Sequence, residues 1–263
     1  MRVRSGDAEI SYTVLGQGPD VVLLHPFPAH HGVWQPVGEL LSTRYRVILP
    51  DLRGLGESGV GEGPATMEKH ALDIARVCDE AGVGKALFGG ESIGGYILFE
   101  FWRRFRERVR GLVLANTRTG ADSAEGRANR LRSAEEVGKR GVDSFVESML
   151  PKLLGKTTQS NRPDLVARAR AMMMKATAAG IAAVQRGMAQ RPDSAPTLAT
   201  ISVPLLILHG GEDVLIPVGE AEQMHRSAGG STLRIIPQAG HFAVFERADE
   251  AGALIRKFLD SCA

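Results

Sequence analysis

The sequence predicts an α/β fold in which helices cover both faces of a mostly parallel sheet. Three observations indicate this architecture. Strand-like and helix-like patterns alternate along much of the chain. The strand segments are short, continuous apolar runs, as expected for strands buried on both faces. The 263 residues, 43% hydrophobic and 24% charged, suffice for one substantial core of ordinary globular composition.

The first part of the chain contains five expected strands and the helices between them. The strands are expected over residues 9–15, 20–24, 45–49, 85–88 and 109–115, and the helices over 32–41, 67–81 and 93–104. The helix over 67–81 shows a clear amphipathic pattern, and Gly82 follows it as a stop signal. The residues expected near its apolar face are Leu72, Ala75, Val77 and Cys78.

The alternation lapses between about residue 120 and residue 196, where strand candidates are almost absent. Helices are expected there over 131–137, 142–150 and 165–178. Alternation then resumes with strand 203–208, helix 219–227, strand 232–236 and helix 248–259. We therefore expect one core domain, residues 1–119 and 197–263, with a helical cap or lid of residues 120–196 over the strand ends.

Composition excludes several classes of protein. The net charge of +2 is too small to indicate binding to nucleic acid or to a membrane surface. No apolar run approaches the ~20 residues of a membrane span, and residues 1–6 lack the apolar core of a secretory signal. Cys78 and Cys262 lie far apart in the sequence, so we expect no disulfide and a cytoplasmic location. No cluster shows metal-ligand spacing, so neither a metal nor another cofactor is expected.

Residues 86–95 form the most informative segment. An apolar strand runs into Gly90-Glu91-Ser92-Ile93-Gly94 and then into a helix. In this order of elements a serine is held on a sharp turn with its hydroxyl exposed at the top of a sheet. Small residues are needed on both sides because the chain reverses there in close contact with its neighbours.

A serine nucleophile needs a base, and the base needs an orienting carboxylate. Two later strands end in loops with these groups: one contains Glu212 and Asp213, and the other contains His241. Carboxyl ends of parallel strands share one edge of a sheet. We therefore expect Ser92, Asp213 and His241 to converge as a catalytic triad, with Glu212 as a competing acid.

Acyl transfer also requires N–H donors for the developing oxyanion. Ile93 offers one at the N-terminus of its helix, where negative charge is favoured. The second donor is expected from His25-Pro26-Phe27-Pro28, the loop after strand 20–24. Proline has no N–H, so Phe27 is the predicted donor, while His25 is expected to orient the loop.

The chain resembles α/β-hydrolase-fold serine hydrolases over nearly its whole length, and within them small carboxylesterases and enol-lactonase-like enzymes. This resemblance implies an eight-stranded, mostly parallel sheet with the lid inserted after strand six. It also favours Asp213 over Glu212 and makes Asp51 and Arg53 scaffold residues. The matching segments are residues 25–28, 51–58 and 90–94, the Asp213 loop and Gly240-His241-Phe242.

The resemblance implies hydrolysis of small to medium carboxylic esters or lactones through an acyl-enzyme on Ser92. Cleavage of an enol-lactone or a carbon–carbon bond in aromatic catabolism is the alternative, and a ligand-sensing relative is a third. Within this resemblance, a glutamate directly before the serine, here Glu91, favours ester cleavage. The alternative interpretation is that Glu91 is a buried, hydrogen-bonded packing residue.

The lid is expected to form the roof of the substrate pocket. For the arginines of the lid and its adjoining loops, a solvated surface is favoured over a clamp for a substrate carboxylate. These arginines include Arg118, Arg127, Arg130 and Arg168. The expected pocket residues are Met149, Met172, Met173, Leu215 and Phe242.

Overall fold

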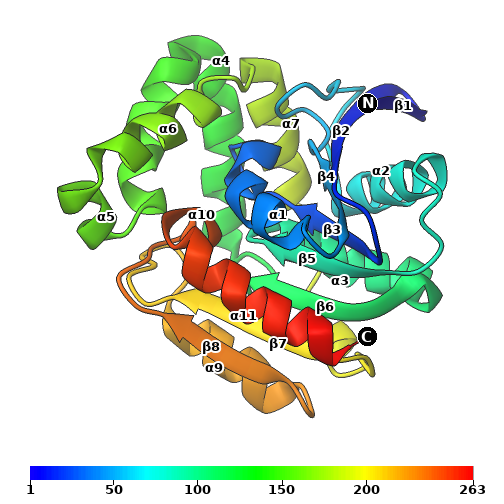
Figure 1. The fold of residues 1–263 in the computed structure, drawn as a ribbon. Helices are drawn as coiled ribbons and strands as arrows, with labels where there is room; N and C mark the ends of the chain where they lie inside the picture. Colours follow the sequence, from blue (N-terminus) through cyan, green and yellow to red (C-terminus); the bar gives the residue numbers. More distant parts are fainter. Residues whose placement is uncertain (263) are drawn as a thin grey trace.

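The computed structural model describes residues 1–262 and contains an eight-stranded sheet with the order β1-β2-β4-β3-β5-β6-β7-β8 (Figure 1). β1 (Arg2–Ser5) and β2 (Ala8–Leu15) form an antiparallel edge, and β2 also pairs antiparallel with β4. All other pairs are parallel. The predicted mostly parallel sheet is thus confirmed. Its remaining strands are β3 (Asp20–Leu24), β4 (Arg46–Pro50), β5 (Ala86–Glu91), β6 (Val109–Ala115), β7 (Leu205–Gly210) and β8 (Thr232–Ile236).

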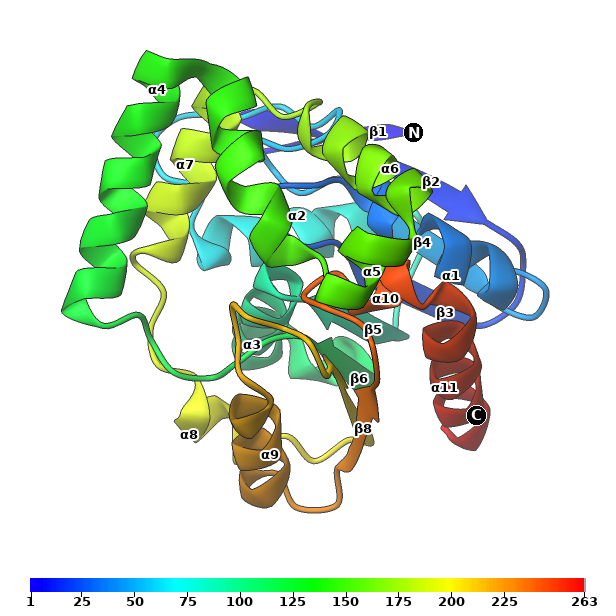
Figure 2. The ribbon, with the colours of Figure 1, turned by 90° about the vertical axis from the view of Figure 1, so that its left-hand side faces the viewer.

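Helices cover both faces of the sheet, as Figures 1 and 2 show. One face is covered by α1 (Gln35–Leu41) and α11 (Ala248–Ser261), and the other by α2 (Met67–Glu80), α3 (Ile93–Phe105) and α9 (Val218–Ser227). Alternate residues of each central strand belong to opposite cores, since successive side chains of a strand point to opposite faces. On β3, Val22 and Leu24 pack with α2 and α3, whereas Val21 and Leu23 pack with α1 and α11.

The cap follows β6 and lies over one end of the sheet, in green in Figure 1. The helical insertion expected after the sixth strand is therefore present. Its longest helix, α4, has a break at Gly141 (φ 80°, ψ 169°), which divides it into the two limbs seen in Figure 2. The cap helices are α4 (Ala124–Leu153), α5 (Lys156–Asn161), α6 (Pro163–Met173) and α7 (Ala178–Met188).

Short elements complete the described chain. Two of them, η1 (His31–Val33) and η2 (Arg106–Arg108), are 3₁₀ turns, and α8 (Ala195–Leu198) and α10 (Ala243–Glu246) are single-turn helices. Among the described residues, no helix combines the length and the apolar character needed to cross a bilayer. Cys78 and Cys262 are both free thiols.

Some elements differ from the sequence-based expectation. The expected helices over 131–137 and 142–150 are parts of one broken helix, and β1 was not anticipated from its four residues. Leu72 is 45% exposed rather than on the buried face of α2.

α7 was not anticipated either, because Gly180 and Gly187 lower its intrinsic helix propensity. These two glycines are explained by tertiary contact. A Cβ atom at Gly180 would lie 1.8 Å from the carbonyl oxygen of Gly54, and one at Gly187 would lie 1.8 Å from that of Ala65. The absence of side chains therefore lets α7 pack directly on the backbone of the core.

The contact between α7 and the core gives a stability prediction. We expect Gly187→Ala to lower the free energy of unfolding by about 1–3 kcal/mol, because the added methyl group overlaps backbone that must move. Gly138 is an exposed glycine within α4, and a Cβ atom there would meet nothing within 4 Å. Gly138→Ala should therefore raise the free energy of unfolding by up to about 1 kcal/mol. Urea denaturation of both variants tests this, and equal stability of the two would contradict it.

Candidate active site

Ser92 lies in a strained turn between β5 and α3, with φ 56° and ψ −114°. The two glycines that frame it make close backbone contacts. A Cβ atom at Gly90 would lie 2.4 Å from the carbonyl carbon of Gly94, and one at Gly94 would lie 2.5 Å from the carbonyl oxygen of Leu24. The turn therefore seats the first turn of α3 against the end of β3.

The three residues predicted to form a triad are hydrogen-bonded in series. His241 Nε2 lies 2.8 Å from Ser92 Oγ, and His241 Nδ1 lies 2.8 Å from Asp213 Oδ2. An ionised carboxylate only accepts, so Nδ1 carries the proton and Nε2 accepts from the Ser92 hydroxyl. All three residues are buried. In this arrangement the imidazole can take the proton of an attacking serine.

Asp213 receives several hydrogen bonds besides that of His241. The backbone N–H groups of Leu215 and Ile216 donate to Oδ1 at 2.8 Å and 3.0 Å, and Asn116 Nδ2 donates to Oδ2 at 2.8 Å. Burial by itself raises the pKa of Asp213. The charge and hydrogen bond of His241, together with the Asn116 amide, outweigh burial and lower the pKa below its ordinary value. The site therefore keeps an ionised carboxylate beside the imidazole.

The sequence predicted no role for two residues that support Asp213. Asn116 follows β6, and its amide also donates to the carbonyl of Gly240 at 3.1 Å. His209 Nε2 donates to the carbonyl oxygen of Ile216 at 2.8 Å, so His209 holds the loop that contains Asp213. The one sequence feature that could have pointed to Asn116 as a site residue is its position directly after a strand. Only the strand order, in which β6 neighbours β7, puts it beside Asp213.

Glu212, the competing acid, faces the cap instead of His241. It accepts hydrogen bonds from Thr157 N at 2.8 Å and from Thr157 Oγ1 at 2.6 Å. Glu246 makes a second link, because its two carboxylate oxygens each lie 2.8 Å from a backbone nitrogen, one of Gly155 and one of Gly240. Both acids therefore fasten the cap to the loops of Asp213 and His241.

The two predicted oxyanion donors lie on the loop that follows β3 and on α3, which the turn at Ser92 brings into contact. Ile93 is the first residue of α3, where helical N–H groups have no partner within the helix. Phe27 belongs to the loop after β3, and no backbone carbonyl of the described residues accepts its N–H.

His25 fixes the loop that contains Phe27. Its Nδ1 donates to the carbonyl of Pro26 at 2.9 Å, and its Nε2 accepts from Leu52 N at 2.8 Å. Burial lowers the pKa of His25 to about 4, so at neutral pH the ring is uncharged and can act as donor and acceptor at once.

A cavity of about 150 Å³ lies between the core and the cap and contains both Ser92 and His241. Met149 and Leu215, two of the expected pocket residues, line it. The full lining consists of Phe27, Ser92, Tyr96, Arg118, Arg130, Met149, Leu153, Gln185, Met188, Leu215, Ile216 and His241.

Three expected pocket residues, Met172, Met173 and Phe242, do not line this cavity. Met173 and Phe242 are fully buried in the core that lies on the α1 and α11 side of the sheet, and Met172 packs at its margin. For the two methionines the reason is the position of α6, which packs against η1. Its methionines attach the cap to the core instead of covering Ser92. Phe242 precedes α10 and belongs to the same core as Val244 and Phe245 of that helix.

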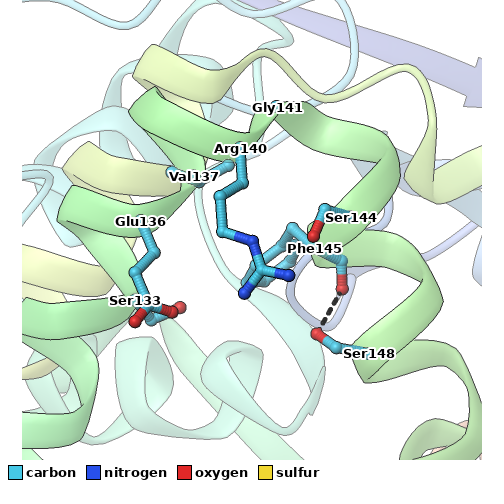
Figure 3. A pocket seen from close by; sticks show the side chains of 8 residues that line it. All are labelled: Ser133, Glu136, Val137, Arg140, Gly141, Ser144, Phe145 and Ser148. Carbon is cyan, nitrogen blue, oxygen red and sulfur yellow. Dashed lines mark hydrogen bonds between the residues drawn. The ribbon is translucent and has the colours of Figure 1, made fainter.

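A second hollow of about 170 Å³ lies between the two limbs of α4 (Figure 3). It is lined by Ser133, Arg140, Ser148 and neighbouring residues, and by none of the predicted triad. Phe145 also lines it and packs edge-on against Phe27, with ring centroids 5.8 Å apart. Since Phe27 belongs to the other cavity, these two rings lie between the two spaces.

One group of side chains has the proximity that a metal site needs. In the described part of the chain, donor atoms of His30, His31 and Asp51 lie within 4.8 Å of one another. Asp51 is already bonded by His31 Nδ1 at 2.7 Å and by the N–H groups of His31 and Glu57, each at 2.9 Å. These bonds satisfy the carboxylate with groups of its own loop and of η1, which agrees with a scaffold role.

Glu91, the residue before Ser92, is fully buried. Its Oε1 accepts from Val244 N at 3.3 Å, and its Oε2 has no hydrogen-bond partner among the described residues. Burial raises the pKa of Glu91 well above its ordinary value, and this effect outweighs the backbone hydrogen bonds that lower it. Burial in the folded protein therefore favours the protonated form of this carboxyl group.

The raised pKa of Glu91 predicts a pH-dependent effect on stability. Above about pH 4.5, the unfolded chain releases a proton that the folded chain keeps, so this group lowers the free energy of unfolding as pH rises. Glu91→Gln has no such proton to lose. We expect its stability relative to the original protein to increase as the pH rises from about 4.5 through neutrality. Urea denaturation across this range measures it, with Glu222→Gln on the exposed side of α9 as control; parallel pH profiles for the original protein and Glu91→Gln would contradict it.

Comparison with known proteins agrees with this architecture. The α/β hydrolase fold family matches the chain over residues 19–248. A thermophilic esterase from Thermogutta terrifontis, solved with malate bound, is 39% identical, with a TM-score of 0.97 over 100% of this chain and 99% of that one. A pimeloyl-(acyl-carrier protein) methyl ester esterase from Nitrosomonas europaea is 30% identical over 89% of this chain and 93% of its own length. The 3-oxoadipate enol-lactonase 2 of Acinetobacter baylyi is 25% identical over 92% and 89%. The chain thus belongs to the α/β hydrolase fold family, among esterase and lactonase relatives.

Proposed function

We propose that the protein hydrolyses small carboxylic esters or lactones through an acyl-enzyme on Ser92. The observation that supports this most directly is the hydrogen-bonded series Ser92–His241–Asp213 beside a cavity under the cap. The similarity to esterases and to an enol-lactonase supports the same class of reaction. In this proposal residues 120–196 act as the lid of the cavity.

In the first half of the reaction, Ser92 Oγ forms a bond to the ester carbonyl carbon while its proton passes to His241 Nε2. Asp213 stabilises the resulting imidazolium. The N–H groups of Phe27 and Ile93 donate to the oxyanion of the tetrahedral intermediate. His241 then gives its proton to the leaving alkoxide as the carbon–oxygen bond breaks, which leaves the acyl group on Ser92.

In the second half, His241 accepts a proton from water, and the hydroxide formed attacks the acyl carbon. The same N–H groups hold the new oxyanion, and His241 returns the proton to Ser92 Oγ as the acid leaves. The cavity of about 150 Å³ and its apolar wall of Met149, Leu153 and Met188 favour a small acyl group.

Enol-lactone cleavage is the second candidate, and the observation that favours it is the similarity to 3-oxoadipate enol-lactonase. The chemistry at Ser92 is the same, except that the leaving oxygen stays attached to the acyl product. Relative kcat/KM values for simple esters, saturated lactones and enol-lactones distinguish the two candidates.

Replacing the nucleophile tests the proposal directly. We expect Ser92→Ala to reduce kcat for p-nitrophenyl butyrate by about 10⁴-fold or more, because no oxygen remains to form the acyl-enzyme. Ser148→Ala, in the other hollow of the cap, is the matched control and should keep its activity. A fluorophosphonate should modify Ser92, as mapped by mass spectrometry of the digested protein. Full activity in a folded Ser92→Ala variant would reject the mechanism.

A second pair of variants tests which acid orients His241. We expect Asp213→Asn to lower kcat by about 10³- to 10⁴-fold, because the amide favours the wrong imidazole tautomer. Glu212→Gln should change kcat less than about tenfold, because Glu212 bonds to Thr157 of the cap. Initial rates with p-nitrophenyl butyrate measure both. A larger loss for Glu212→Gln than for Asp213→Asn would reverse the assignment.

A further inference from the structure

Three guanidinium groups share one carboxylate beside the Ser92 cavity. Arg118 Nη2 and Arg191 Nη2 each donate to Asp122 Oδ1 at 2.9 Å, and Arg130 Nε donates to Asp122 Oδ2. Asp122 is buried at 4% exposure. A single negative charge thus faces three positive charges, which leaves this end of the cap positively charged.

Neighbouring groups do not neutralise this excess of positive charge. Burial raises the pKa of Asp122, but the hydrogen bonds and charges of Arg130 and Arg191 bring it down to about 2, so Asp122 contributes one full negative charge. Glu220 acts on Arg118 only through longer-range electrostatics. Arg191 is turned away from water over the ring of Tyr96, with 4.1 Å to its centroid.

Two of these arginines, Arg118 and Arg130, line the same cavity as Ser92 and His241. No aspartate or glutamate is among the described residues that line it. Arg118 Nε is buried and has no hydrogen-bond partner among the described residues. A buried N–H donor without an acceptor is unfavourable, so the single carboxylate of Asp122 leaves the donors of Arg118 incompletely satisfied.

We propose that the natural substrate is an ester or lactone bearing a carboxylate, and that Arg118 and Arg130 bind this carboxylate while Ser92 attacks the carbonyl. The inference rests on the proposed function and narrows its substrate class. Guanidinium groups match the planar carboxylate through paired N–H donors. The cavity of about 150 Å³ limits the linker between carboxylate and reacting carbonyl to a few atoms.

This assignment separates the arginines of the lid and its adjoining loops, which the sequence analysis treated together. Arg118 and Arg130 line the cavity, which differs from the solvated surface expected for them. Arg168 packs over Phe245, 5.2 Å from its ring centroid, and Arg127 donates to the backbone carbonyl of Asp122 at 3.1 Å. Neither of these two lines the cavity.

The test compares substrates that differ only in charge. Mono-p-nitrophenyl succinate carries a carboxylate where p-nitrophenyl 4-methylpentanoate carries an isosteric isopropyl group. A second pair, 4-acetoxybutanoate and its amide, places the charge on the alcohol half. The measured quantity is the ratio of kcat/KM for the charged and the neutral member of each pair.

We expect the original protein to prefer the charged member of at least one pair. In Arg118→Gln this preference, taken as the ratio of the two kcat/KM values, should fall about tenfold or more, because the carboxylate loses a charged partner. Arg118→Lys should retain part of the preference. Arg140→Gln is the matched control, since Arg140 lines only the other cap hollow in Figure 3 and its loss changes the net charge equally.

Three results would overturn the inference: no charge preference in either pair, a preference unchanged in Arg118→Gln, or an equal loss in Arg140→Gln. Failure of the proposed function is distinguishable, because the neutral esters would then not be cleaved or would still be cleaved by Ser92→Ala.

If Arg118→Gln unfolds, as measured by a thermal melt, inhibition of the original protein tests the carboxylate site instead. Succinate should then inhibit p-nitrophenyl butyrate hydrolysis competitively and at least about tenfold more strongly than succinamide, and equal inhibition would overturn the proposal.

Discussion

The close backbone contact around Ser92 is the constraint on which the rest of the site depends. Only glycine at positions 90 and 94 allows the end of β5 to meet the first turn of α3, and that turn to meet the carbonyl of Leu24. Residues at the end of β6 also hold Ser92 in its positive-φ conformation. Its N–H donates to the carbonyl of Ala115 at 2.9 Å, and its carbonyl accepts from Thr117 Oγ1 at 2.8 Å. Strain at one residue is thus offset by contacts with two adjacent strands.

The parallel sheet converts this local turn into a site, because the carboxyl ends of β3, β5, β6, β7 and β8 lie at one edge. Each loop at that edge supplies one part: Phe27, Ser92, Asn116, Asp213 and His241. Hydrogen bonds between the loops hold these parts in register. The Asp213 carboxylate accepts hydrogen bonds from three different loops, those of Asn116, Leu215 and His241. These bonds together fix the position of the carboxylate.

The cap has two separate tasks, and different helices perform them. α6 uses its methionines to attach the cap to η1 and to the core beneath it. The first limb of α4 and α7 supply Arg130, Gln185 and Met188 to the cavity wall. Glu212 and Glu246 link the cap to the loops of Asp213 and His241 by hydrogen bonds to backbone. Movement of the cap relative to the core would therefore disturb the loops of Asp213 and His241 directly.

The sequence by itself determined the alternation of strands and helices, the turn at Ser92 and the order of the acid and base loops. These features are encoded over a few adjacent residues, such as the glycines around Ser92 and the prolines that make Phe27 the predicted N–H donor of its loop. Strand order and cap orientation arise from packing between distant segments, which no local pattern reports. Tertiary structure alone therefore placed Asn116 beside Asp213, buried Met173 away from the cavity and gathered three arginines around Asp122.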